Sequence, residues 1–334
     1  MGWLTLSSFK VQNSISADFS FMKAVLGTMN FGPQVDLNTA EEMVQMFLAK
    51  GYIEIDTAYV YNEGVTEQML GNILPNIDRL SFSVASKANP RITGKLDYNA
   101  VISQCNESLR RMNLAYLDIL YLHMPDSKTP LEEALRACAT LFNEGKIKTL
   151  GLSNFPSWMV AQASEISQNN NWIKPSVYQG LYNGLSRSVE RELFGCLTKY
   201  GIKFYAYNPL AGGMLTGKHQ EFDKEPPAGR FARLESYRKR YWNKAYFTAV
   251  NQINEICAMY SIPTTEAAYR WLMHHSMLRN ECDDAIIIGV SSIKQFEANL
   301  SALNEGLLSD EILGAFNAAN DISISEGPEY FYFY

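Results

Sequence analysis

Residues 53–64 read Ile-Glu-Ile-Asp-Thr-Ala-Tyr-Val-Tyr-Asn-Glu-Gly. The apolar, β-branched start predicts a short buried strand that ends at Asp56. The spacing of apolar residues from Glu63 to Leu74 predicts an amphipathic helix. Tyr59 and Tyr61 lie between these two elements. The segment is therefore a strand–turn–helix unit with polar and aromatic side chains just past the carboxyl end of its strand.

The same unit recurs along almost the whole chain. Eight strands that alternate with helices favour a parallel α/β sheet, which can be a closed barrel or an open doubly wound sheet. The alternation alone is about equally compatible with the closed barrel and with the open sheet. Strands are expected at Ala24–Gly27, Ile53–Asp56, Ser81–Ser86, Ile119–His123, Thr149–Ser153, Ser176–Gln179, Lys203–Tyr207 and Ile286–Gly289, and helices at Thr39–Lys50, Glu63–Leu74, Tyr98–Met112, Leu131–Glu144, Pro156–Gln168, Val189–Lys199, Lys244–Met259 and Thr264–His275.

The positions of polar residues favour the barrel. In a barrel the carboxyl ends of all strands converge on one mouth, where active sites are built. Polar side chains at or just past successive strand ends are Asp56, Lys87, His123, Ser153–Asn154, Gln179, Asn208 and Ser291–Ser292. We therefore expect a (β/α)8 TIM barrel as a single domain over residues 21–334, after an N-terminal extension over residues 1–20. Pro209–Trp242, after the seventh strand, is long and rich in glycine and proline, which is typical of a lid or binding loop or else of a disordered segment.

Composition excludes several classes of protein. Of the 334 residues, 47% are hydrophobic and 19% charged, so the chain can bury a large core and is not disordered. The formal net charge of −6 argues against a nucleic-acid partner. The apolar runs are too short to cross a membrane. Five cysteines without a Cys-x-x-Cys pair indicate a reduced, cytoplasmic location, and the four histidines show no zinc-site spacing.

Seven motifs in this order resemble those of the aldo-keto reductase superfamily, and especially of its aflatoxin aldehyde (succinic semialdehyde) reductase branch. They are VLGTMNFG (25–32), EIDTAYVYNEG (54–64), YLHMPD (121–126), GLSNF (151–155), VYQGLYN (177–183), YAYNPLAGGMLTGK (205–218) and GVSS (289–292). Each motif is weak alone, and the set spans residues 22–330. The resemblance implies a barrel that reduces and detoxifies small carbonyl compounds with NADPH, and the resembled branch suggests a homodimer.

The resemblance assigns a catalytic tetrad of Asp56, Tyr61, Lys87 and His123. Carbonyl reduction needs a hydride on carbon and a proton on oxygen, and a phenol donates its proton well only if its anion is stabilised. Lys87 can supply that stabilising charge, Asp56 can keep Lys87 charged, and His123 can orient the substrate carbonyl. Taken singly, such residues are more often ordinary rim charges or a buried core histidine.

Tyr59 competes with Tyr61 for the role of acid. In an extended segment two residues that are two positions apart point the same way, so spacing does not separate them. The family pattern places the acid five positions after the aspartate, which selects Tyr61. Tyr59 then becomes a wall of the substrate pocket, together with Met29.

The sequence lacks Gly-x-Gly-x-x-Gly after a strand, so it gives no support to a Rossmann cofactor site. A barrel binds phosphate at its last strands and at the start of the next helix, and residues 289–295 suit the 2′-phosphate of NADPH through Ser291, Ser292 and Lys294. A plain N-capped helix is the alternative there, and a simple turn at Gly212–Gly213. The resemblance implies cofactor contacts from Ser153, Asn154, Gln179, Tyr207, Asn208, Leu210, Gly212, Lys218, Arg230, Gly289, Ser291, Gln295 and Asn299.

The chain ends in Glu-Tyr-Phe-Tyr-Phe-Tyr, and the tail is expected to lie over the barrel mouth. The resembled branch carries an arginine where Tyr332 stands here, and that arginine helps to hold acidic substrates. A tyrosine cannot form a bidentate, charged pair with a carboxylate. We therefore expect aromatic or dicarbonyl substrates to be preferred to succinic semialdehyde, unless Arg230 or Arg233 supplies the charge or the tail packs outside the pocket.

Two other functions compete with a reductase. The β subunits of potassium channels keep this fold and cofactor but act as regulatory partners, and slow turnover with tight cofactor binding would favour that reading. A barrel hydrolase or lyase could instead use Asp56 and Glu63 as paired carboxylates. The complete tetrad favours the reductase.

Overall fold

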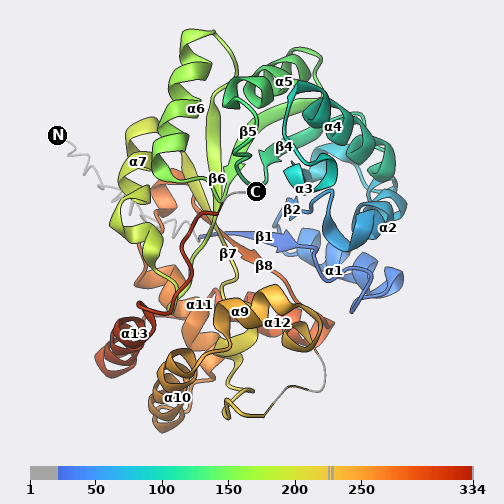
Figure 1. Cartoon of the computed structure of the whole chain (residues 1–334). Helices are drawn as coiled ribbons and strands as arrows, with labels where there is room; N and C mark the ends of the chain where they lie inside the picture. Colours follow the sequence, from blue (N-terminus) through green and yellow to red (C-terminus); the bar gives the residue numbers. More distant parts are fainter. Residues whose placement is uncertain (1–21, 225, 227–228, 333–334) are drawn as a thin grey trace, which may run out of the picture.

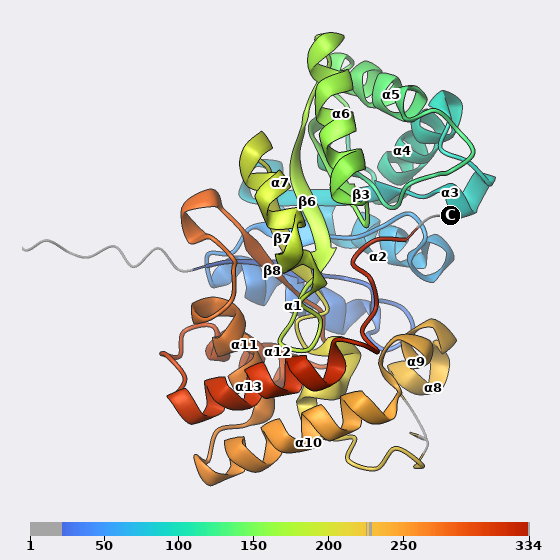
Figure 2. The same ribbon diagram turned by 60° about the vertical axis from the view of Figure 1, so that its left-hand side comes forward.

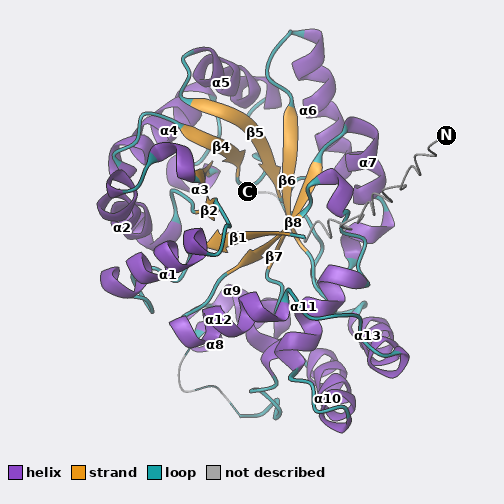
Figure 3. Cartoon of the chain, turned by 180° about the vertical axis from the view of Figure 1, so that it is seen from behind, coloured by secondary structure: helices purple, strands orange, loops and turns teal. Residues whose placement is uncertain are grey.

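Eight parallel strands close into a barrel in the order β1 to β8. The structure is a computed structural model that describes residues 22–224, 226 and 229–332, so the expected extension over residues 1–20 lies outside the described residues. The (β/α)8 prediction is confirmed, and Figures 1 and 3 show the strands enclosed by a ring of helices. The strands are β1 (Lys23–Gly27), β2 (Glu54–Asp56), β3 (Ser83–Ala88), β4 (Leu117–Leu122), β5 (Ile147–Ser153), β6 (Pro175–Leu181), β7 (Lys203–Tyr207) and β8 (Ala285–Ile288).

Most residues of the strands are buried, because helices cover the outer side of the barrel and side chains fill its interior. All four residues of β8, for instance, are buried. The barrel interior is a packed core and not a pore. It is filled by Val25, Ala85, Ile119, Tyr121, Val177, Tyr205, Ala285 and Ile287.

A ring of helices covers the outside of the barrel. These helices are α1 (Leu37–Ala49), α2 (Val65–Ile73), α4 (Tyr98–Met112), α5 (Leu131–Asn143), α6 (Ser157–Asn169), α7 (Leu193–Tyr200), α11 (Thr264–His274) and α12 (Ile293–Ala302). Asp36 and Asp97 start α1 and α4 by accepting a hydrogen bond from the backbone N–H three residues on. The predicted bounds of α4 match the structure.

Two long helices lie outside this ring. The predicted helix α10 (Lys244–Met259) packs alongside α13 (Asp310–Ser323), below the barrel in Figure 2. The sequence analysis placed no element over α13. Its buried face consists of Ile312, Phe316, Ala319 and Ser323.

The long loop after β7 contains short helices. A 3-10 turn spans Ala211–Thr216, and α8 (Arg230–Arg233) and α9 (Glu235–Tyr241) follow. A further short helix, α3 (Pro90–Thr93), follows β3. These segments and the tail after α13 surround the carboxyl ends of the strands (Figures 1 and 2). The described part of the loop therefore forms a wall of short helices beside the carboxyl ends of the strands.

The tail after α13 is attached to the barrel at Tyr330. The Tyr330 hydroxyl donates to Glu192 and accepts from the backbone N–H of Ser157 at 3.0 Å. Two residues later, the backbone N–H of Tyr332 lies 3.4 Å from the carbonyl oxygen of Asn154. The tail thus reaches the barrel mouth, as expected for its described residues, while residues 333–334 lie outside the described chain.

Candidate active site

A cavity of about 760 Å³ opens at the carboxyl ends of the strands. Of the expected tetrad, Asp56, Tyr61 and His123 line it. Lys87 lies directly behind the wall and is 1% exposed. Among the described residues, no helix is long and apolar enough to cross a membrane, and no cluster of side chains suits a metal ion.

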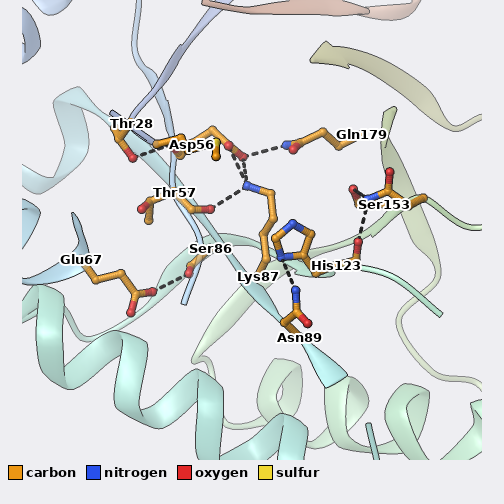
Figure 4. A network of polar contacts seen from close by, with 12 residues as sticks. Thr28, Asp56, Thr57, Glu67, Ser86, Lys87, Asn89, His123, Ser153 and Gln179 are labelled. Carbon is orange, nitrogen blue, oxygen red and sulfur yellow. Dashed lines mark hydrogen bonds and ion pairs between the residues drawn. The ribbon is translucent and has the colours of Figure 1, made fainter. Parts of the chain in front are cut away.

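Asp56 and Lys87 form a buried ion pair between β2 and β3. Lys87 Nζ lies 2.7 and 2.6 Å from the two carboxylate oxygens of Asp56 and 2.7 Å from the carbonyl oxygen of Thr57 (Figure 4). These contacts use all three donors of the ammonium group. Gln179 Nε2 donates a further bond of 2.7 Å to Asp56 Oδ1. Burial lowers the pKa of Lys87, and the charge of Asp56 opposes that shift.

Tyr61 faces the cavity as a neutral phenol. Burial first, and then the charge of Asp56, raise the pKa of Tyr61 well above its ordinary value. Lys87 Nζ lies 5.1 Å from the centre of the Tyr61 ring. The hydrogen bonds of Lys87 go to Asp56 and Thr57, so within the described chain Lys87 acts on the phenol through its charge and not through a hydrogen bond. The raised pKa keeps the phenol protonated near pH 7.

Tyr59 does not line the cavity, contrary to expectation. Its ring lies against the guanidinium group of Arg111 on α4, with 4.1 Å from Cζ to the ring centre. Arg111 also donates to the carbonyl oxygen of Tyr59 at 3.2 Å. The chain is not extended between the two tyrosines, because residues 58–61 form a turn in which the Tyr61 N–H donates to the carbonyl oxygen of Ala58 at 3.0 Å. A 3-10 turn (Tyr61–Gly64) follows directly.

The helix expected from Glu63 begins at Val65, because Asn62 and Glu63 have φ angles of 49° and 57°. Asn62 adopts this left-handed conformation while its amide donates to the carbonyl oxygens of Met29 and Phe31 at 3.0 and 2.9 Å. The loop that bears Tyr61 is thereby fastened to the loop after β1. Glu63 is exposed and does not line the cavity, so the structure gives no support to an Asp56–Glu63 carboxylate pair.

His123 follows β4 and lies edge-on to Tyr61, with ring centres 6.2 Å apart. Its Nδ1 lies 3.0 Å from Nδ2 of Asn89, a residue that the sequence analysis did not single out (Figure 4). Burial first, and then the positive charges of Lys87 and Arg91, hold the pKa of His123 well below its ordinary value. The ring is therefore neutral near pH 7.

The expected nicotinamide contacts come together on one side of the cavity. Asn154 Nδ2 donates to the carbonyl oxygen of His123 at 2.9 Å, and Asn154 Oδ1 accepts from the Tyr207 hydroxyl at 2.7 Å. Ser153 and Gln179 line the same wall, and the Tyr207 ring is available for stacking. These side chains offer the donors, acceptors and flat face that a nicotinamide with its carboxamide needs.

The cavity also has cationic side chains that suit phosphate. Lys218 and Arg230 line it, and neither forms an ion pair with a carboxylate of the described chain. Arg230 Nη2 instead donates to Asn30 Oδ1 at 3.1 Å. Two uncompensated cations in one cavity fit a pyrophosphate-containing dinucleotide. The remaining expected cofactor residues also line the cavity, namely Asn208, Leu210, Gly212, Gly289, Ser291, Gln295 and Asn299.

The start of α12 differs in part from expectation. Ser292 is its N-cap and accepts from the backbone N–H of Gln295 at 3.3 Å. Lys294 is exposed, and neither residue lines the cavity. Ser291 does line it, and its hydroxyl donates to Gln295 Oε1 at 3.0 Å. The segment is thus the N-capped helix of the alternative, with Ser291 next to it on the cavity wall.

Met29 and Tyr332, which were expected to contact the substrate, both line the cavity. Arg233 is exposed and does not line it, which corrects that expectation. Arg91 and Arg240 line it instead, from α3 and α9. Neither arginine forms an ion pair with a carboxylate among the described residues. The sequence offered no signal for them, because arginines on short helices read as ordinary surface charges.

Comparison with known proteins agrees with this arrangement. The profile of the aldo/keto reductase family matches residues 23–321, which is most of the chain. The chain belongs to the aldo-keto reductase family. It is 44% identical over 319 residues to human aflatoxin B1 aldehyde reductase member 2, covering 92% of this chain and 89% of that protein. It is 43% identical over 319 residues to human aldo-keto reductase family 7 member A3, covering 92% and 96%.

A more distant relative, the oxidoreductase sirO of Leptosphaeria maculans, is 30% identical over 320 residues, 92% of this chain and 96% of that protein. As an aldo-keto reductase, the chain is an oxidoreductase that acts on small carbonyl compounds with a nicotinamide cofactor. Its cavity brings the expected proton donor and the expected nicotinamide contacts to one place.

Proposed function

We propose that this aldo-keto reductase reduces aldehydes and ketones to alcohols with NADPH, and that Tyr61 is the proton donor. The observation that carries the proposal is the convergence of Tyr61, His123 and the Asp56–Lys87 pair on one wall of the cavity. The reduced nicotinamide, when bound, supplies the hydride. Tyr61 transfers its phenolic proton to the carbonyl oxygen as the negative charge develops there.

The remaining residues of the wall assist this transfer electrostatically. The phenolate that Tyr61 leaves behind is disfavoured by burial, and the ammonium group of Lys87, 5.1 Å from the ring centre, offsets part of that cost. Asp56 keeps Lys87 in place by accepting two of its three hydrogen bonds. Gln179 in turn holds Asp56 with a bond of 2.7 Å.

Preference for NADPH is supported by the cationic part of the cavity around Lys218 and Arg230 and by the Ser291 hydroxyl. A cytoplasmic location is supported by the five cysteines, all of which are free thiols. The names of the human relatives suggest aldehydes as substrates, and the aromatic tail suggests bulky or dicarbonyl compounds among them.

A panel of aldehydes tests the proposal. Purified protein is given NADPH with aromatic, dicarbonyl and semialdehyde substrates, and both cofactor oxidation and the product alcohol are measured. We expect one alcohol formed for each NADPH oxidised. Tight NADPH binding without turnover on any member would reject the enzyme and favour a cofactor-binding regulatory subunit.

A further inference from the structure

The hydrogen bond between Asn89 and His123 restricts which nitrogen of His123 can carry the proton. Asn89 follows β3 as the N-cap of α3, and its Oδ1 accepts from the backbone N–H of Arg91 at 2.9 Å. A backbone N–H can only donate, so the oxygen of the amide must face Arg91. The NH2 group of Asn89 must therefore face His123 Nδ1, 3.0 Å away.

The backbone of Asn89 is fixed by two hydrogen bonds to Gln104 of α4. Its backbone N–H donates to Gln104 Oε1 at 2.9 Å, and Gln104 Nε2 donates back to the Asn89 carbonyl oxygen at 3.1 Å. Both residues are buried, with 4% and 2% exposure. The His123 backbone is fixed as well, because its N–H donates to the carbonyl oxygen of Ala88 at 2.9 Å. The amide thus has little freedom to turn.

We propose that Asn89 is a positioning residue that holds His123 as the neutral tautomer with its proton on Nε2. An amide NH2 group has no lone pair to offer, so Nδ1 must accept and Nε2 must carry the hydrogen. Nε2 lies on the other side of the ring from Asn89 (Figure 4). The donor is therefore available to a carbonyl oxygen bound in the cavity, a role that rests on the proposed function.

The charges around His123 agree with a neutral ring. Lys87 faces it from β3 and Arg91 from α3, and Tyr61 contributes an uncharged phenol. Asp56 lies behind Lys87 and is bonded to it. With cations as the near charges and no carboxylate bonded to either ring nitrogen within the described chain, a second proton on the ring is disfavoured.

The substitution Asn89→Asp is expected to change the tautomer of His123 while it leaves the fold intact. An aspartate has nearly the same shape and keeps an oxygen for the N–H of Arg91, so α3 retains its cap. Its second oxygen can only accept, so it stabilises a proton on His123 Nδ1. Near neutral pH this leaves the Nε2 lone pair facing the carbonyl oxygen. At lower pH the doubly protonated ring regains the Nε2 donor.

The first measurement is the ¹⁵N NMR spectrum of the histidine rings in the protein without substrate. The chain has only four histidines, so a His123→Gln variant identifies the His123 signals. We expect an unprotonated Nδ1 and a protonated Nε2 in the unaltered chain, and a protonated Nδ1 in Asn89→Asp. This result does not depend on catalysis, so it stands or falls separately from the proposed function.

The second measurement is the pH profile of kcat/KM for aldehyde reduction. For Asn89→Asp we expect a loss of roughly 10²-fold near pH 7, the size seen when one preorganised donor to an oxyanion is removed. We also expect kcat/KM of this variant to recover toward acidic pH, and we expect no such recovery for the unaltered chain. Asn243→Asp is the matched control, because Asn243 caps α10 in the same way, with a bond of 3.0 Å from the N–H of Tyr246, and no hydrogen bond joins it to a histidine of the described chain.

Three outcomes would overturn the proposal. They are a protonated Nδ1 in the unaltered chain, an Asn89→Asp variant with unchanged ring signals, and a changed tautomer without any change in the pH profile. If Asn89→Asp fails to fold, Asn89→Ser keeps a capping oxygen but removes the donor without adding charge. That variant must then show a mixture of His123 tautomers and a lower kcat/KM.

Discussion

Tyr59 and Tyr61 lie two residues apart on opposite sides of one loop: Tyr61 lines the cavity, whereas the Tyr59 ring stacks on Arg111, 4.1 Å from its Cζ. The left-handed residues Asn62 and Glu63 turn the chain directly after Tyr61. The loop therefore carries one tyrosine for the site and one that fastens the loop to α4.

This relationship gives the first prediction. Tyr61→Phe removes the phenolic proton and is expected to lower kcat/KM for aldehydes by roughly 10²–10⁴-fold, the usual contribution of a general acid. NADPH affinity, measured by fluorescence quenching, should stay nearly unchanged. Tyr59→Phe keeps the ring that stacks on Arg111 and should retain most activity. If the two variants exchanged these results, Tyr59 would be the acid.

The second prediction concerns the cofactor. We expect kcat/KM with NADPH to exceed that with NADH by at least about tenfold, or about 1.4 kcal/mol. Ser291→Ala should reduce the preference, because its hydroxyl lines the cavity. Lys294→Met should change it less, because Lys294 is exposed and does not line the cavity. Equal kcat/KM for the two cofactors in the unaltered chain would refute the phosphate site.

The third prediction concerns the tail. Tyr332 offers only a neutral donor where the resembled branch has an arginine, so we expect an aromatic aldehyde or dicarbonyl to be a better substrate than succinic semialdehyde. Tyr332→Arg should raise kcat/KM for succinic semialdehyde roughly 10–150-fold, because a charged hydrogen bond contributes about 1.5–3 kcal/mol. Benzaldehyde, which has no carboxylate, is the control substrate and should not gain.

A variant of Arg240 can contradict this third prediction. It lines the same cavity without an ion-pair partner among the described residues, and so it can hold a carboxylate itself. If the unaltered chain prefers succinic semialdehyde and only Arg240→Met removes that preference, the charge comes from α9 and the interpretation of Tyr332 is wrong.

The fourth prediction concerns stability. A Cβ at Gly71 of α2 would lie 2.1 Å from the carbonyl oxygen of Arg111 on α4, so the two helices must move apart. Gly71→Ala is expected to lower the free energy of unfolding by about 1–3 kcal/mol, despite the better helix propensity of alanine. Gly314 of α13 has no such neighbour within 4 Å. Gly314→Ala should raise stability by about 0.5–1 kcal/mol.

Urea titrations of both glycine variants measure these effects. Equal shifts of the two midpoints in the same direction would show that the α2–α4 contact is not tight.

The fifth prediction concerns thiol chemistry. Burial raises the pKa of Cys105 to about 12 and of Cys257 to about 11, so little thiolate forms at pH 8 and neither should react with a disulfide reagent in the folded protein. Cys282 is exposed and should react first. Cys282→Ser should remove the fast phase, and reactivity of the buried thiols should appear only on unfolding or as the pH approaches these pKa values.

The sequence predicted the elements that belong to the repeating unit. Lys203–Tyr207, Tyr98–Met112 and Lys244–Met259 have the predicted bounds, because apolar periodicity and turn residues act locally. No element was predicted over Asp310–Ser323. Its buried residues follow a helical spacing, but it packs on α10 outside the barrel, and a strand–helix alternation gives no reason to expect it.

The candidate site also depends partly on local sequence patterns and partly on contacts between residues that are far apart in the chain. The four expected tetrad residues lie at or just past the carboxyl ends of strands, and the sequence pattern reveals those ends. The direction of Tyr59 depends on Arg111, which is 52 residues away along the chain, and no local pattern contains that contact. The role of Asn89 depends on His123, 34 residues away. The dipeptide Asn89-Pro90 after a strand nevertheless indicates a helix start. The polar side chain of Asn89 at a strand end is a second local signal for a site residue.

The tail is attached at Tyr330, whereas the cavity is reached two residues later, at Tyr332. Glu192 and Ser157 hold Tyr330 through groups of the barrel that take no part in lining the cavity. Attachment of the tail and lining of the cavity are thus separate tasks of Tyr330 and Tyr332. A chain built in this way can exchange the side chain at position 332 while the attachment at Tyr330 and the barrel stay the same, so the shape and charge of the cavity can change at little cost in folding free energy.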